Sequence, residues 1–443
     1  MKTTSNILST KSISMLFITY AIPAVIAMII SGTQGMIDGM FIGNHVSSNA
    51  LASVNIAQPF MHLIIGISMI ISIGTQSYVG LNLGNGNKEK AQNCFHTFKI
   101  IIWISAAIVT MLGLTLNTQL ANLLGADATL VSDTATYIKW ISIFAIPMCT
   151  MFYFGFLNRI IGRPERYFYG SIISIIVNIS LDYLLIARLD MGVMGAALAT
   201  GTAYISALLF VVSPMLNKEN VLNVFVGKFS TECIGKTLYN GSSEGINTIS
   251  IAVTAFLFNT SLMQIAGAGG VAAFTAINYM GTFGGMLLFG ISDGIGPIIS
   301  YNFGTNDIKR VKQMMKIAYV TNFIFGIILF LLLFFAGEQL VGLFIKDEPA
   351  LVQLAASGGK LYGISFLMSG FNILNSGYFT FIGKGLESVI VAASRGLVFV
   401  SIGIILLPKF FEINGIWLSV PFAELCAVII GIMLLRKTKT VVK

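Results

Sequence analysis

The chain has 443 residues, of which 56% are hydrophobic and only 10% are charged, and its mean hydropathy is +0.86. Globular proteins carry about 25% charged residues, so this composition excludes an ordinary soluble domain and indicates a polytopic helical membrane protein. The net charge of +8 is spread along the chain as a topology signal, so we expect no nucleic-acid partner. The four cysteines lack CxxC spacing and the three histidines form no cluster, so we expect neither a disulfide framework nor a metal site.

Apolar segments long enough to cross a bilayer, for which about 20 residues suffice, recur along the chain. The first is too long for a signal-peptide core and has no cleavage pattern of small residues, so we expect it to remain as a span. Twelve spans are predicted, at residues 13–42, 51–83, 95–116, 137–161, 168–187, 192–213, 236–262, 271–302, 315–336, 359–382, 389–407 and 414–435.

The positive charges support this number of spans. With twelve spans both termini lie on one side of the membrane, and 21 of the 26 basic residues then fall on that side, Lys2 and Lys443 among them. The opposite side keeps Arg188, Lys346 and Lys409, with two further lysines at the entrances of spans. Because basic loops stay cytoplasmic, we expect a multi-pass protein of a prokaryotic plasma membrane with both termini in the cytoplasm.

The chain also repeats itself at an offset of 220 residues: 51–58 (LASVNIAQ) resembles 271–278 (VAAFTAIN), and 82–84 (NLG) matches 302–304 (NFG). The repeat predicts an all-α protein with twelve transmembrane helices in two pseudo-symmetric six-helix lobes around a central cleft. The lobes are residues 1–216 and 237–443, joined by a cytoplasmic connector at 217–236. Parallel repeats of this kind are typical of transporters. A channel is less well supported, because no filter-like loop or charged ring repeats.

Five acidic residues fall inside the predicted spans: Asp38, Asp182, Glu244, Asp293 and Glu424. No lysine or arginine is predicted deep within a span to pair with them. A proton, a metal ion or a cationic substrate is therefore expected to neutralise them. Charges in hydrocarbon are costly, and such residues usually line an ion or substrate path.

Asn178 and Asp182 are four residues apart, so in a helix they share one face. If Asp38 faces the same cavity, two carboxylates at low dielectric cannot both ionise cheaply, and the pair could exchange a proton for a small cation. Oxygen ligands from Asn178, Thr200 and a nearby carbonyl would suit sodium. Pro23 removes a helical hydrogen bond in the first span and favours a bend there. The alternatives are that Asp38 only caps its span and that Asn178 and Asp182 only bond to neighbouring helices.

In the second half, Glu244, Asp293 and Glu424 are candidates for binding a cationic substrate or a second proton, although Glu424 could only tie helices together. The run 267–270 (GAGG) has no following Gly-Lys-Ser/Thr and reads as an external turn. The many methionines and phenylalanines provide soft surfaces that suit bulky substrates of varied shape. Further candidates for the lining of the cleft are Gln34, Asn55 and Met61.

Several motifs in combination resemble the multidrug and toxic compound extrusion (MATE) exporters, and the resemblance covers nearly the whole chain. These motifs are 38–43 (DGMFIG), 162–164 (GRP), 177–183 (VNISLDY), 191–200 (MGVMGAALAT) and 297–304 (PIISYNFG). The resemblance implies two six-helix lobes that open alternately to each side, with efflux driven by inward flow of protons or sodium.

The resemblance also implies where the coupling ion binds. In prokaryotic members named for DNA-damage induction, the N-terminal lobe holds this site, and the matching residues here are Asp38, Asn178, Asp182, Thr200 and the carbonyl of Ala196. Pro23 matches the proline at which the first helix is proposed to bend on protonation. Another branch of the family uses acidic residues of the C-terminal lobe, and Glu244 resembles the one in the seventh span. Many members have glutamine near the position of Asp293.

The sequence thus predicts a secondary antiporter rather than an enzyme. It would export lipophilic, cationic drugs or toxic compounds in exchange for H+ or Na+, need no cofactor, contact small-molecule substrates and membrane lipids, and act as a monomer. Two alternatives stay open. A lipid-linked saccharide flippase of a related fold would be expected to have a basic cleft. A non-transporting receptor or scaffold would leave the repeat and the membrane carboxylates unexplained.

Overall fold

The computed structural model describes residues 5–342 and 348–441, and all regular secondary structure in these ranges is helical. Lys2, Lys346 and Lys443, which entered the charge count above, lie outside the described residues. The helices are α1 (Ser5–Thr10), α2 (Ile13–His45), α3 (Ser48–Gly84), α4 (Lys88–Thr115), α5 (Asn117–Leu123), α6 (Val131–Ile143), α7 (Ala145–Ile160), α8 (Glu165–Asp182), η1 (Tyr183–Arg188), α9 (Gly192–Val212), η2 (Ser213–Leu216), α10 (Glu232–Gly304), α11 (Ile308–Gly342), α12 (Pro349–Gly363), α13 (Phe366–Phe381), α14 (Gly385–Ala393), η3 (Ser394–Val398), α15 (Phe399–Leu406) and α16 (Pro408–Val441).

Ten stretches of helix in the described ranges are long and apolar enough to cross a membrane, and the bent pair of α6 and α7 makes an eleventh. The bend of 52° between α6 and α7 precedes Pro147, which has no N–H to offer to the carbonyl one turn earlier. The one remaining predicted span, 359–382, covers the end of α12 and all of α13. The all-helical, twelve-span class predicted from the sequence is confirmed.

The chain packs as two compact units. Unit 1 holds the residues up to Ser12 together with Ile26–Gly241 and Ser300–Asp307, and unit 2 holds Ile13–Val25, Ser242–Ile299 and the residues from Ile308 onward. Helices α2 and α10 therefore contribute to both units. In unit 2 the first part of α2 approaches α10 closely, because a Cβ at Gly294 would lie 2.7 Å from the Cα of Ala21.

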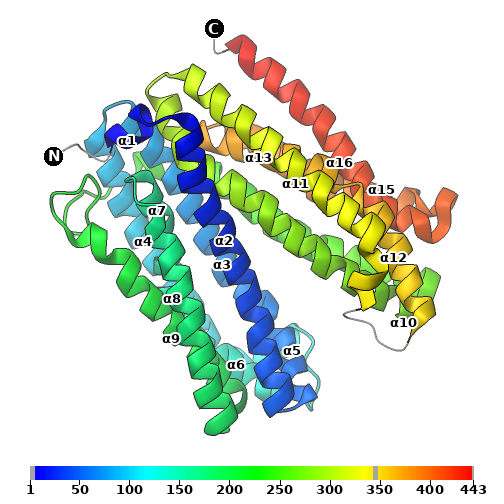
Figure 1. Cartoon of the computed structure of the whole chain (residues 1–443). Coiled ribbons are helices and arrows are strands. Elements are labelled where there is room, and N and C mark those ends of the chain that lie inside the picture. Colours follow the sequence, from blue (N-terminus) through cyan, green and yellow to red (C-terminus); the bar gives the residue numbers. More distant parts are fainter. Residues whose placement is uncertain (1–4, 343–347, 442–443) are drawn as a thin grey trace. The chain divides into compact units, whose positions relative to one another are not determined.

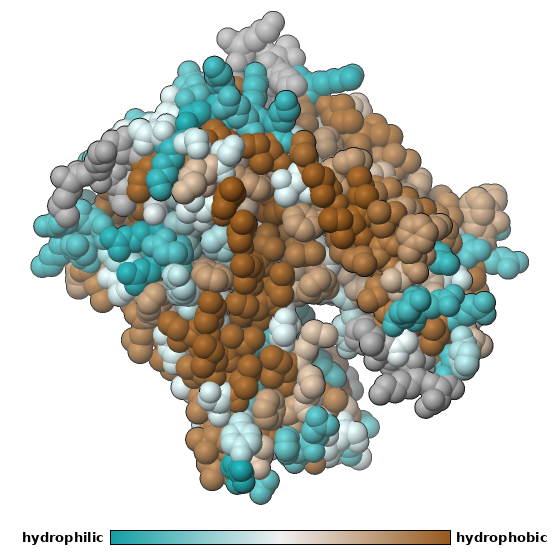
Figure 2. All heavy atoms as spheres, in the orientation of Figure 1, coloured by the Kyte–Doolittle hydropathy of each residue, from teal (hydrophilic) through white to brown (hydrophobic). Residues whose placement is uncertain are grey.

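Unit 1 is built around helices that pack side by side, chiefly α8 with α9, α3 with α4 and α7, and α7 with α9 (Figure 1). On the face of unit 1 that Figure 2 shows, hydrophobic side chains cover the middle of the helices and hydrophilic ones gather at their ends. This distribution is what a bilayer requires, because apolar side chains meet the hydrocarbon and polar ones meet water.

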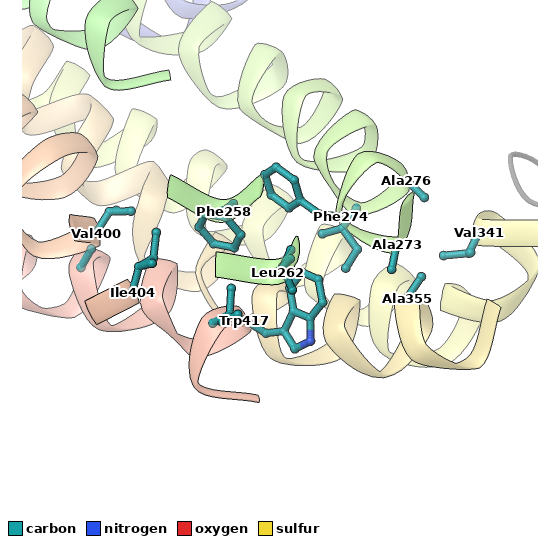
Figure 3. Close-up of a cluster of buried hydrophobic side chains, with 13 residues drawn as sticks. Phe258, Leu262, Ala273, Phe274, Ala276, Val341, Ala355, Val400, Ile404 and Trp417 are labelled. Atoms are coloured by element: carbon teal, nitrogen blue, oxygen red, sulfur yellow. The ribbon is translucent and has the colours of Figure 1, made fainter. Parts of the chain in front are cut away.

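Unit 2 has an aromatic and aliphatic core. The ring of Phe258 stacks on the ring of Phe274, with centroids 4.5 Å apart, and its centroid lies 6.4 Å from that of the Trp417 ring. Figure 3 shows these three side chains within the buried hydrophobic cluster. Phe258 and Phe274 lie on the two parts of α10, which kinks at Gly267 (φ 62°, ψ −157°). Glycine is the residue that adopts this backbone without strain, so the turn predicted at 267–270 is present.

The segment between η2 and α10 is fixed along α4 within unit 1. The Gln92 side chain donates to the carbonyls of Asn223 (2.7 Å) and Val226 (2.6 Å) and accepts from the backbone N–H of Asn223 (3.1 Å). The Lys99 ammonium donates to the Val224 carbonyl at 2.7 Å. The segment predicted as a polar connector is therefore a structured strap, and α10 already begins at Glu232.

Candidate cation site

The interior face of α8 is polar. Ser171, Ser174, Asn178 and Asp182 are all buried at helical spacing, whereas Ile176 on the opposite face is exposed. In a membrane helix, apolar side chains face lipid and polar ones need partners inside the bundle. Asp182 ends α8, and the π-helix η1 follows at once. Such π-helical turns frequently occur at functional sites.

The turn between η1 and α9 sets the register of the two helices. Asp190 and Gly192 take positive φ angles of 50° and 55°, which glycine adopts freely and aspartate tolerates. The backbone N–H of Met191 donates to the carbonyl of Leu185 at 2.9 Å. This tight reversal lets α9 pack along α8, so that residues from both helices can reach one site.

Four side chains from three helices meet inside unit 1. The Thr200 hydroxyl, on α9, donates to Oδ2 of Asp38, on α2, at 3.0 Å. The Asp38 carboxyl also interacts with the side chains of Asp182 and Asn178 on α8. Their exposed fractions are 8% for Asp38, 0% for Asn178 and Asp182, and 3% for Thr200. Helix α2 continues to His45, so Asp38 lies within the helix rather than at its end.

Most polar atoms of this cluster have no hydrogen-bond partner among the described residues. They are Oδ1 of Asp38, both carboxylate oxygens of Asp182, and both Oδ1 and Nδ2 of Asn178. Because buried polar groups are almost always paired, these atoms are available to a proton, an ion or a water molecule.

The chemistry of the cluster limits which ion fits. Two carboxylates, an amide and a hydroxyl offer the oxygen ligands that hard cations prefer. Within the described ranges, no group of three or more His, Cys, Asp or Glu side chains is placed to hold a metal ion. Such a donor set can take up a proton or bind an alkali cation. Ala196 is buried one turn before Thr200, and its carbonyl as a further ligand stays a prediction.

Polar residues continue one turn along the same helices. The Ser174 hydroxyl, four residues before Asn178, donates to Oε1 of Gln34, four residues before Asp38, at 3.4 Å. Both side chains are buried. The equal spacing on α2 and α8 makes a second polar layer next to the carboxylates.

Two buried tyrosines near the cluster were missed by sequence reasoning. Tyr137 on α6 interacts electrostatically with Asp38 and Asp182, and Tyr204 on α9 interacts with Asp38. Tyr204 follows Thr200 by one helical turn, so its position could have been inferred from spacing. Nothing in the local sequence of Tyr137 links α6 to α2.

Other predicted residues lie on α2, α3 and α10. Pro23 lies inside α2, in the part that belongs to unit 2, and the helix is continuous through it. On α3, Met61 is buried and Asn55 is exposed. In unit 2, Asp293 is buried, and Glu244 is half-buried and interacts electrostatically with it.

The structure corrects the expectation that no basic residue lies deep in a span. Arg395 lies within the apolar span Gly385–Leu406, and its Nη2 is 3.0 Å from Oε1 of Glu424. Glu424 is therefore not an unpaired membrane carboxylate. The prediction failed because the positive-inside assignment placed Arg395 at the cytoplasmic side.

Two more basic residues are buried in unit 1. The Arg159 guanidinium lies 4.7 Å from the ring centroid of Phe156 and 4.5 Å from that of Tyr167. Lys99 reaches the Val224 carbonyl, as described above. A flippase is expected to have a basic cleft, but these buried basic side chains are engaged otherwise: Arg159 stacks on rings, Lys99 holds the strap and Arg395 pairs with Glu424.

Two sets of membrane-spanning helices related by a sequence repeat, with an ionisable cluster inside the first, define a polytopic membrane transporter. A family model described as MatE matches the chain in two segments, residues 23–184 and 245–405, which begin 222 residues apart. Together they cover more than half of the sequence. The chain belongs to the MatE family, that of the MATE transporters.

Individual proteins agree over the full length. The "Multidrug export protein MepA" of Staphylococcus saprophyticus is 27% identical over 433 residues, covering 96% of this chain and 94% of that protein. The protein of the same name from Staphylococcus aureus is 26% identical over 428 residues, covering 95% and 94%. A solved MATE structure in a "straight conformation" is similar with a TM-score of 0.93 at 20% identity, covering 100% of this chain and 99% of that chain.

A further solved structure is a MOP superfamily transporter from Pyrococcus furiosus, with a TM-score of 0.92 at 20% identity and coverage of 100% and 99%. Its title reports a reversed polarity of the binding pocket and suggests a different function for that protein. At 20% identity the similarity shows a shared fold. What the site of this chain binds therefore has to be inferred from its own residues.

Proposed function

We propose that this protein is a secondary antiporter of a bacterial plasma membrane that exports lipophilic, cationic compounds in exchange for inward-moving H+ or Na+. The observation that carries the proposal is the burial of Asp38 and Asp182, two carboxyl groups that interact electrostatically inside unit 1 and have no basic partner among the described residues. The relatives named as multidrug exporters support the substrate class.

The paired carboxylates can hold one proton, two protons or one alkali cation, and each state leaves a different charge in the interior. Because a net charge at low dielectric is costly, the states differ in which helix arrangement they favour. A cation that binds from outside and leaves to the inside then biases the opening of the transporter. Thr200 and Asn178 supply the neutral ligands that complete the shell of a bound sodium ion.

One exchanged cation is sufficient for useful export. A monovalent cation that moves down a total gradient of about 150 mV releases roughly 3.5 kcal/mol. That free energy sustains an outward substrate gradient of about 300-fold.

The test is ethidium efflux from proteoliposomes under separately imposed sodium and proton gradients. Asp38→Asn and Asp182→Asn are each expected to abolish gradient-driven efflux while the protein still inserts. Asp190→Asn is the matched control, because Asp190 is exposed and asparagine accepts its positive φ. Efflux that survives in both site variants but is lost in Glu244→Gln or Asp293→Asn would move the coupling site to unit 2 and reject the assignment.

A further inference from the structure

Glu424 of α16 has its carboxylate fully engaged inside unit 2. Oε1 accepts from the Ser369 hydroxyl at 2.8 Å and lies 3.0 Å from Nη2 of Arg395. Oε2 accepts from Nδ2 of Asn372 at 2.6 Å. The side chains of Arg395 and Glu424 are only 16% and 3% exposed. Both oxygens of this carboxylate thus have donors that stabilise its charged form.

Arg395 is held in place by the π-helix η3. Its neighbour Gly396 packs so closely on α10 that an added Cβ would lie 2.6 Å from the Cβ of Ser250. The Gly396 carbonyl accepts from the Thr254 hydroxyl at 3.1 Å. The guanidinium itself lies 5.5 Å from the ring centroid of Phe289. The arginine is therefore built into the packing of unit 2 rather than free to swing.

The sequence repeat relates this pair to the cluster of unit 1. At the offset of 221 residues that relates Gly162 to Gly383, Arg395 corresponds to Ser174 on α8. At the offset of 223 that relates Gly192 to Gly415, Glu424 corresponds to Gly201, next to Thr200 on α9. The ion pair thus stands on the repeat counterparts of the helices that carry Asn178, Asp182 and Thr200.

The two clusters differ in one respect that decides what they can bind. In unit 1, the two carboxylates and Asn178 keep five polar atoms without a hydrogen-bond partner among the described residues. In unit 2, a permanently charged guanidinium already lies against the carboxylate. We propose that Arg395 is a built-in counter-ion that keeps Glu424 charged and closed to the transported cation, so that this repeat counterpart of the unit 1 cluster takes no part in cation exchange. This inference rests on the proposed antiport.

Other ionisable groups face the pair. Glu244 on α10 interacts electrostatically with Arg395 and with Asp293, and Tyr362 on α12 interacts with both Arg395 and Glu424. If Arg395 were removed, Glu424 would be a buried carboxylate without a basic partner among the described residues. It would then have to take up a proton or a sodium ion, as the unit 1 cluster does.

The first test measures the thermal midpoint of the purified protein between pH 5 and pH 8, with and without sodium. Arg395→Met is expected to lower the midpoint at pH 8 by about 5–10 °C. The deficit should shrink at pH 5 or in sodium, because a proton or sodium replaces the lost charge. The double variant Arg395→Met/Glu424→Gln should regain the parental pH profile. Lys316→Met, which removes an exposed charge from α11, is the control and should match the parent.

A deficit that is equal at every pH and persists in the double variant would show that Arg395 acts only by packing, and the proposal would be wrong. The second test is efflux by the double variant, which applies even where Arg395→Met alone fails to fold. Parental dependence on sodium and proton gradients is expected, whereas loss of that dependence would make Glu424 a coupling ligand. The measurement of the thermal midpoint does not depend on transport. It therefore tests the role of Arg395 separately from the efflux assay, which tests the assignment of Asp38 and Asp182.

Discussion

Thr200 and Asp38 are 162 positions apart in the sequence, and the Thr200 hydroxyl donates to Asp38 Oδ2 at 3.0 Å inside unit 1. This bond joins α9 to α2 at the carboxylate that we assign to cation coupling. It also gives the cluster a neutral oxygen that can turn toward a bound ion.

The hydroxyl of Thr200 is expected to contribute to cation affinity. Thr200→Val keeps the shape of the side chain but removes the donor, and hydrogen bonds to charged groups are worth about 1.5–3 kcal/mol. We predict a rise of about 10-fold to 100-fold in the cation concentration that half-saturates efflux. Thr200→Ser retains the hydroxyl and should stay near the parent. This role would be contradicted if the valine and serine variants needed the same cation concentration to half-saturate efflux.

Gly201 is predicted to be required for the packing of α9. A Cβ at this position would overlap the ring of Phe144, which lies at the break between α6 and α7. Overpacking of this kind costs about 1–3 kcal/mol, so Gly201→Ala should lower the thermal midpoint of the purified protein. Gly235→Ala is the control, since a Cβ there has no neighbour within 4 Å in the described structure. A Gly201→Ala protein as stable as the control would refute the close contact.

The strap between η2 and α10 should loosen when Gln92 is replaced. Gln92→Ala removes three hydrogen bonds to Asn223 and Val226, each worth about 1 kcal/mol. Limited proteolysis is expected to cut the strap at least about tenfold faster than in the parent. Gln119→Ala, at an exposed position of α5, controls for the substitution itself. Unchanged cleavage would mean that the strap is held by other contacts.

The stability of the loop before α6 is expected to depend on pH through Asp127. The Asp127 carboxylate accepts from the hydroxyl of Thr129 at 2.7 Å and from the backbone N–H groups of Thr129 and Leu130 at 2.8 and 3.0 Å, which lowers the pKa of Asp127 below its ordinary 3.8. A lowered pKa in the folded state means that the loop is stabilised above the ordinary value and loses this contribution as pH falls through the lowered value. Titration of the labelled carboxyl by NMR should show the shift, and Thr129→Ala should reduce it. A pKa at or above 3.8 in the parent would contradict these contacts.

Much of the fold followed from the sequence because long apolar runs leave a membrane chain few options. The spans, the turn at Gly267 and the repeat were all visible as patterns. The ends of helices were less accurate, because α10 and α11 continue into polar segments that hydropathy alone cannot assign. The bend in α16 lies at Glu412, which has a φ of 50°, and no glycine at that position predicted it.

The candidate site, like the fold, could be predicted from the sequence only in part. Helical spacing put Asn178 and Asp182 on one face. Asp38 was proposed as an acidic residue inside a span and Thr200 as an oxygen ligand, and the family resemblance pointed to the same four residues. The pair of Arg395 and Glu424 was missed, because it depends on a contact between two helices and on a π-helical segment that no local pattern reveals. Tyr137 was missed for the related reason that packing, not spacing, brings α6 to the carboxylates.

The central claim is that Asp38 and Asp182 together exchange the coupling ion. The most direct measurement is proton release from purified protein in weakly buffered detergent on addition of sodium or of ethidium. The parent and Asp190→Asn should release protons, and Asp38→Asn/Asp182→Asn should release none. Proton release from that double variant at the parental level would show that the exchanged proton is held elsewhere, and the account of the site would be wrong.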